Sequence, residues 1–235
     1  MVTILDWPDR AARFDADSWW LTVTTKSPGA GLDGRRQVIF REMRTWANSV
    51  SITKLWADRP GLLRAFIDDL MGASGVFRLP VYNGLTYRYT GDLVAFFALF
   101  SLTSAEIASG LPFDDGTTWD DGAGWDLPET ADPTVLADAP IGATRLMLDG
   151  FLGRNLAIGG VFTVNGFMYR VAENLDGAIR FNPPLREAIT AGTIAEVNAP
   201  KIVVRLSQDT GGRLTLAPLN IGSVQAFDVE EAFQR

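Results

Sequence analysis

The residues with the clearest potential for chemistry lie between positions 113 and 126, where aromatic rings and carboxylates alternate. An aromatic residue followed by aspartate recurs at six-residue intervals, at Phe113, Trp119 and Trp125. Clustered carboxylate oxygens can bind Ca²⁺, but these acids follow neither the order of an EF-hand loop nor that of a calcium-binding repeat. The competing interpretation is a polar linker whose aromatic side chains pin it to the surface of a neighbouring module.

The same segment is also compatible with carbohydrate binding. Trp119 and Trp125 could stack on a sugar ring, while Asp120 and Asp121 could accept hydrogen bonds from its hydroxyl groups. This alternative makes the protein a binding module that recognises carbohydrate on a cell surface.

Composition excludes the commonest catalytic groups. The chain contains no histidine and no cysteine, which removes Ser-His-Asp triads, Cys-His pairs and ordinary zinc sites. A carboxylate-based glycosidase would need two acids about 5–10 Å apart in a cleft. No spacing singles out such a pair, since Asp68 and Asp69 adjoin on a predicted helix and point about 100° apart. We expect no enzyme, no catalytic residue, no cofactor site and no metal site.

Charge and hydropathy indicate a soluble globular chain. Of its 235 residues 47% are hydrophobic, and its net charge is −7. This acidic balance argues against a surface that tracks phosphate groups, which would need a basic excess. The longest apolar run, residues 93–102, is too short for a membrane-spanning helix, and the N-terminus lacks the pattern of a signal peptide. We therefore expect folding in the cytoplasm and no membrane insertion.

Residues 135–199 have the pattern of a compact all-β module. Short runs of β-branched and aromatic residues are separated by glycine, Asn-Gly and Pro-Pro, as is typical of antiparallel strands. Asn165-Gly166 and Asp176-Gly177 are hairpin signals, because both residues of a type I′ turn need positive φ. The expected strands are residues 144–148, 158–164, 167–171, 179–181 and 193–197.

The segments that flank this module carry the pattern of a second β domain. Alternation predicts strands at 18–25, 37–47, 49–56, 76–79, 202–206 and 224–233, with Asn48 as a bend or bulge. Two strands alone cannot fold, so the C-terminal pair must complete a sheet begun in the N-terminal half. The sequence therefore predicts a discontinuous domain, 1–112 and 200–235, with a linker at 113–134 and an inserted module at 135–199.

One amphipathic helix is expected in the N-terminal half. Asp58 is its N-cap candidate, and Pro60 lies in its first turn, where a missing N–H costs nothing. The apolar stripe of this helix consists of Leu62, Leu63, Phe66, Ile67, Leu70 and Met71.

Two adjacent tryptophans mark a candidate interface. Trp19 and Trp20 are consecutive in a predicted strand, so their side chains must point to opposite faces. We expect one of them to be exposed in the monomer and covered in an assembly, because interface centres are enriched in Trp and Arg.

Several short motifs follow one another in a recognisable order. Gly72-Ala-Ser-Gly-Val-Phe-Arg-Leu-Pro80 follows the helix, Leu156-x-x-Gly-x-x-Phe162 and Pro183-Pro-Leu-Arg-Glu187 lie in the module, and Phe227-Asp-Val-Glu-Glu-Ala-Phe233 comes near the C-terminus. In this order they resemble the small tail proteins of long-tailed bacteriophages and gene transfer agents, in particular the distal tail protein. The resemblance covers residues 60–80 and 135–235.

The resemblance implies a mainly β protein, with a tail-tube-like β-sandwich, one packed α-helix and an inserted small β-barrel or sandwich module. It implies a homohexameric ring at the tail tip that joins the tail tube protein to the hub or baseplate proteins. DNA would pass through the lumen without specific binding, which an acidic wall favours by repelling phosphate. The location implied is the virion, after assembly in the cytoplasm of the bacterial host, and no catalytic residues come with the resemblance.

We predict that calcium does not stabilise this protein. Thermal unfolding with and without Ca²⁺ should give the same Tm, because Asp114, Asp115, Asp120 and Asp121 lack a recognised coordination order. A calcium-dependent rise in Tm that disappears in the Asp120→Asn/Asp121→Asn variant would contradict this expectation.

Overall fold

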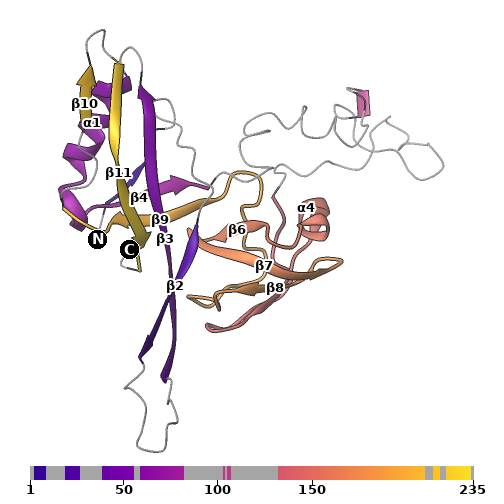
Figure 1. Cartoon of the computed structure of the whole chain (residues 1–235). Helices are drawn as coiled ribbons and strands as arrows, with labels where there is room; N and C mark the ends of the chain where they lie inside the picture. The colour runs from indigo at the N-terminus through magenta and orange to yellow at the C-terminus, as the bar shows by residue number, and fades with distance from the viewer. Residues whose placement is uncertain are drawn as a thin grey trace, which may run out of the picture. The chain divides into compact units, whose positions relative to one another are not determined.

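The structure, a computed structural model, divides into two compact units. The first unit comprises Met1–Val81, Gly166–Met168 and Lys201–Arg235, and the second comprises Tyr82–Asn165 and Tyr169–Pro200. The structure describes residues 3–8, 19–26, 39–55, 59–81, 103, 105–106, 132–209, 214–217 and 221–233. The prediction of a mainly β protein is confirmed, since strands dominate both units (Figure 1).

The first unit is built on one mixed sheet. Its strand order is β1-β4-β9-β11-β3-β2, with β10 paired to β11. β1 runs parallel to β4, and the other pairs are antiparallel. The strands are β1 (Ile4–Asp6), β2 (Trp20–Lys26), β3 (Ile39–Leu55), β4 (Val76–Pro80), β9 (Lys201–Leu206), β10 (Leu214–Ala217) and β11 (Ile221–Glu231).

Strand β3 is continuous, so the prediction of a bend at Asn48 is wrong. Asn48 pairs with Val229 of β11, and the register runs without a shift from Ala47 to Val50. The side chain of Asn48 is fully buried, between Trp46 and Val50 on the same face of the strand. A regular backbone is what places all three side chains in the core. The register shifts of β3 fall elsewhere, between Gly222 and Phe227 of β11 and between Val23 and Thr25 of β2.

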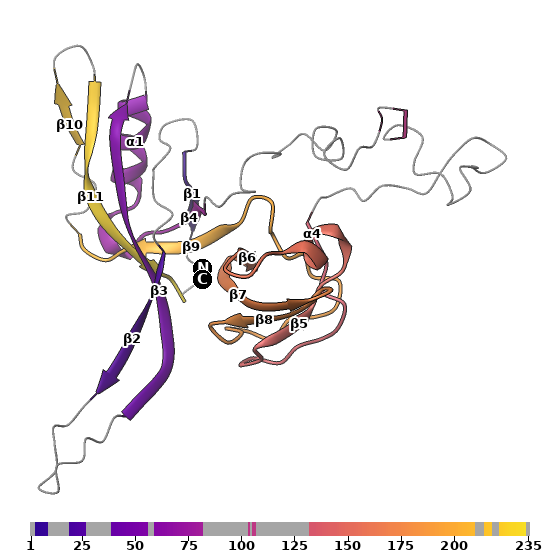
Figure 2. The ribbon, with the colours of Figure 1, turned by 45° about the vertical axis from the view of Figure 1, so that its right-hand side comes forward.

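The two partners of β3 use different parts of it. The β2 register spans Ile39 to Ala47 of β3, whereas the β11 register spans Ala47 to Leu55. Figure 2 shows β3 continuing past β11 to form a two-stranded ribbon with β2.

Helix α1 (Arg59–Asp69) is the predicted amphipathic helix, but its apolar stripe is narrower than expected. Leu63, Phe66 and Leu70 are buried, whereas Leu62 and Met71 are exposed. The buried positions follow the i, i+3, i+7 spacing of a single helix face, which leaves Leu62 and Met71 outside it. The expected N-cap Asp58 lies outside the described residues.

Phe66 anchors α1 to the sheet. Its ring packs edge-on against Phe77 of β4 at a centroid distance of 5.5 Å and against Trp7 at 5.4 Å. These edge-to-face contacts place the helix on the face of the sheet that carries Phe77.

The second unit contains a sheet of order β5-β8-β7-β6. Its elements are β5 (Arg145–Met147), α4 (Gly150–Asn155), β6 (Val161–Val164), β7 (Phe167–Leu175) and β8 (Ala178–Asn182). The rings of Phe162, Tyr169 and Phe181 pack together in its core with centroids 5.1–5.6 Å apart. Both hairpin turns are confirmed, since Asn165, Gly166, Asp176 and Gly177 all have positive φ.

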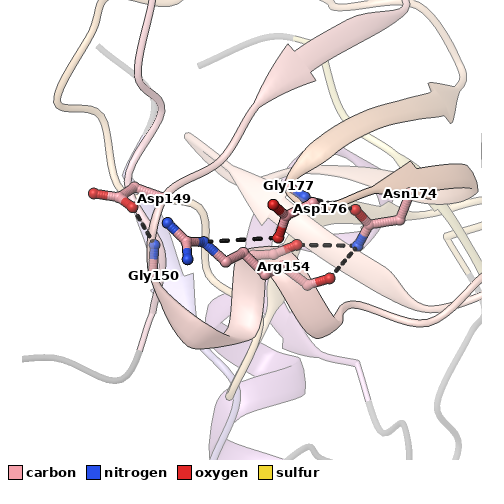
Figure 3. Close-up of polar contacts among 7 residues, drawn as sticks. Asp149, Gly150, Arg154, Asn174, Asp176 and Gly177 are labelled. Atoms are coloured by element: carbon pink, nitrogen blue, oxygen red, sulfur yellow. Dashed lines mark hydrogen bonds and ion pairs between the residues drawn. The ribbon is translucent and has the colours of Figure 1, made fainter.

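Two details of this unit differ from the prediction. Residues 193–197 do not form a strand, because the chain changes partner within them: Ile194 bridges to Thr134 and Glu196 to Thr163. Helix α4 was not expected. Its N-cap is Asp149, whose Oδ1 accepts a hydrogen bond from the backbone N of Gly150 at 2.7 Å (Figure 3).

We predict that Phe66→Ala lowers the free energy of unfolding by about 3–5 kcal/mol, because it removes a buried aromatic side chain. Leu62→Ala, on the exposed side of the same helix, should change it by less than about 0.5 kcal/mol. Chemical denaturation of the two variants measures this difference. Equal stability of both variants and the unmodified protein would mean that α1 does not pack on the sheet through Phe66.

Candidate interaction surface

Segment 113–126, in which the sequence predicts candidate ligand-binding residues, lies outside the described residues. This applies to Trp119, Asp120, Asp121 and Trp125, the candidate sugar contacts, and to Asp114 and Asp115. Within the described ranges, no three acidic side chains come together to hold a metal ion. In the same ranges, no helix is long and apolar enough to cross a membrane.

The two candidate interface tryptophans have opposite environments. Trp19 is buried, with 4% of its surface exposed, whereas Trp20 is 45% exposed. This is the alternation expected for neighbouring strand residues. Because Trp19 is buried within the chain, only Trp20 of this pair remains available to a partner.

Trp20 stands at the end of a row of directly opposed residues that crosses the sheet from β1 to β2. The row, called here the transverse row, consists of Ile4, Val76, Arg205, Glu230, Ala47 and Trp20. Directly opposed residues share one face of a sheet. Phe77, Val204 and Trp46 each neighbour a member of the row along their strands, so they point to the opposite face, where all three are buried. At the β1 end of the row Val76 is buried as well, in a cluster with Val203 and Ala232.

Two ion pairs lie on the face of the transverse row. Arg205 Nη2 lies 2.7 Å from Glu230 Oε1, and Arg78 Nη1 lies 3.3 Å from Asp6 Oδ1 on the adjacent strands. Both pairs are exposed, so each stabilises the fold by less than about 1 kcal/mol. In both pairs a carboxylate neutralises the guanidinium, so neither arginine is free to grip phosphate. The exposed Asp228, two positions from Glu230 on β11, adds a negative charge to the same face.

Small and polar residues surround Trp20 on this face. Its cross-strand partner is Ala47, and the next pair on the same face is Thr22 with Thr45. A half-exposed indole among such neighbours has little apolar surface of its own unit to cover it. This arrangement suits burial against another molecule.

A buried carboxylate supports the strand behind Trp20. Glu231 is buried, and its Oε2 accepts a hydrogen bond from the backbone N of Trp46 at 3.2 Å. Trp46 is fully buried and pairs with Leu21 of β2. The Glu231 side chain thus satisfies a β3 backbone donor where the pairing with β11 ends, and it fixes the point from which the β2–β3 ribbon departs.

Sequence reasoning found Trp20 but not the transverse row. A strand pattern shows which residues share a face of one strand, whereas the row depends on the register between strands distant in sequence. Arg205 and Glu230 are 25 positions apart in sequence, and no local signal indicated their pairing.

Comparison of this chain with known protein families, and separately with curated proteins, finds no match.

We predict that Trp19 and Trp20 contribute differently to stability. Trp19→Ala should lower the free energy of unfolding by about 3–5 kcal/mol, as expected for a buried Trp. Trp20→Ala should lower that of the monomer by less than about 1 kcal/mol. Denaturation at a concentration where the protein is monomeric tests this, and equal losses would show that Trp20 is also a core residue.

Proposed function

We propose that this protein is a structural virion protein, a ring component of the tail tip of a bacteriophage or gene transfer agent. In this role it joins the tail tube protein to the hub or baseplate proteins and leaves a lumen for DNA. It is assembled in the cytoplasm of the bacterial host, and it is not an enzyme. The observation that carries the proposal is the half-exposed Trp20 on the terminal strand of the described sheet, together with the motif order that resembles distal tail proteins.

Ring closure explains why one tryptophan should be left exposed. Identical subunits close a ring through head-to-tail contacts, in which each copy uses one patch against a different patch of the next. Trp20 lies at one end of the transverse row, and β1 lies at the other end. A contact at the Trp20 end can therefore repeat from copy to copy without covering the same surface twice.

The electrostatics of the chain suit a channel that passes DNA. Its net charge is −7, and Arg78 and Arg205, on the face of the transverse row, are each ion-paired. A wall without unpaired basic groups displaces few counterions from DNA, so it does not retain the phosphate backbone.

The proposal predicts a Trp20-dependent assembly. Sedimentation velocity and native mass spectrometry should detect a closed oligomer of the unmodified protein, and Trp20→Glu should leave a folded monomer. Burying an unpaired carboxylate at a subunit seam is unfavourable. Leu62→Glu is the matched control, because Leu62 has a similar exposure of 48% but lies on α1; this variant should still assemble.

Three results would contradict the proposal. One is a protein that stays monomeric at all concentrations, and another is assembly that survives Trp20→Glu in a protein shown by circular dichroism to be folded. The third is hydrolysis of a polysaccharide or peptidoglycan by the purified chain that is lost on substitution of a single carboxylate.

A further inference from the structure

The second unit presents a row of exposed apolar side chains on its outer face. Leu136 N donates to Met147 O at 2.9 Å, Met147 pairs with Ala178, and Ala178 pairs with Leu175. These four residues, called here the apolar row, are therefore neighbours across adjacent chain segments. Their large members are well exposed, at 51% for Leu136, 46% for Met147 and 69% for Leu175.

The apolar row is not an extension of the core. The residues next to it along the chain, Val135, Leu148 and Ile179, are buried. Because side chains alternate along a strand, these neighbours fill the interior while the row points outwards. Scattered exposed apolar residues are ordinary, but a contiguous set on one face commonly marks an interaction surface.

One end of the apolar row is held in place by a hydrogen-bonded turn. Asn174, next to Leu175, donates from Nδ2 to the carbonyl oxygens of Gly153 at 3.0 Å and Leu156 at 2.8 Å. Its Oδ1 accepts from Gly177 N at 3.0 Å, so the amide ties the β7–β8 turn to helix α4 (Figure 3). Leu175 is thus exposed on a fixed backbone.

A positive charge lies beside the apolar row on the same face. Arg145 and Arg180 are directly opposed, two positions from Met147 and Ala178. Glu173 pairs with Arg180 at 3.1 Å, whereas Arg145 has no ion pair or hydrogen bond within the described ranges. Opposed like charges destabilise a sheet, so a carboxylate supplied from outside the described residues would be stabilising here.

We infer that the apolar row is the docking site of the chain's own segment 113–126. This segment repeats an aromatic residue followed by aspartate, at Phe113, Trp119 and Trp125. Its rings match the exposed Leu, Met and Leu side chains, and Met sulfur makes favourable contacts with aromatic rings. Its aspartates match the free guanidinium of Arg145. The inference is independent of the proposed tail function.

The tether between segment and site is short. Only five residues separate Asp126 from Asp132, a span of at most about 20 Å. Asp132 is fixed to the second unit, because its Oδ1 accepts from Val197 N at 2.8 Å and Asn198 N at 2.7 Å. A tether of this length gives an effective concentration on the order of millimolar, so even weak contacts suffice for docking within one chain.

Segment 113–126 and the apolar row should shield each other from solvent, and therefore from labelling by hydroxyl radicals. Hydroxyl-radical footprinting of the full-length protein, read by mass spectrometry, reports the exposure of individual Trp and Met side chains. In the unmodified protein, labelling of Trp119 and Trp125 should be slow, and Met147→Asp or Leu175→Asp should raise it several-fold. Arg145→Glu should raise it as well, whereas Ile158→Asp, a control at an exposed apolar position off the row, should not.

Substitutions in the segment provide a second test, which does not depend on the folding of the variants in the apolar row. Trp119→Ser/Trp125→Ser should raise labelling of Met147 several-fold. Unchanged labelling in both directions would overturn the inference. Protection that appears only at high protein concentration would also overturn it, because the occupant would then be a second copy and not the segment of the same chain.

Discussion

The backbone pairing of β3 is the constraint on which the first unit depends. Residues 39–47 hydrogen-bond to β2 and residues 47–55 to β11, so one strand joins the ribbon to the rest of the sheet. A register slip of one residue would move Trp46, Asn48 and Val50 out of the core. The same register fixes the transverse row, since Ala47 is opposed to Trp20 on one side and to Glu230 on the other.

Each unit carries one candidate interaction surface, around Trp20 on the first unit and along the apolar row on the second. The two surfaces differ in chemistry. On the first unit a single large indole stands among small, polar and ion-paired residues, a pattern suited to a specific seam between subunits. On the second unit several aliphatic side chains adjoin Arg145, which has no ion pair among the described residues, a pattern suited to an acidic and aromatic partner. If segment 113–126 occupies the second surface, Trp119 and Trp125 are covered, and the carbohydrate-binding alternative loses its stacking platform.

Local chemistry explains what could be predicted from the sequence. The Asn165-Gly166 and Asp176-Gly177 turns need positive φ at adjacent residues, and the stripe of α1 needs only helical spacing. Thr103-x-x-Glu106 is a capping box, a motif that local sequence contains. The Thr103 hydroxyl and then its backbone N, each donating to Glu106 Oε2 at 2.6 Å, keep the pKa of the Glu106 carboxyl below its ordinary value. The burial of Asn48 could not be predicted, because a polar residue in a strand pattern gives no sign that it will be buried. The transverse row and the apolar row depend on register, which no local pattern contains.

We propose that Trp20 lies at the seam between identical subunits of a ring. Cryo-electron microscopy of the purified, assembled protein would show this seam. We expect a closed ring of identical subunits around an open channel, with Trp20 of every copy buried against a different patch of the next. Particles of single chains, or a ring in which Trp20 faces solvent, would contradict it.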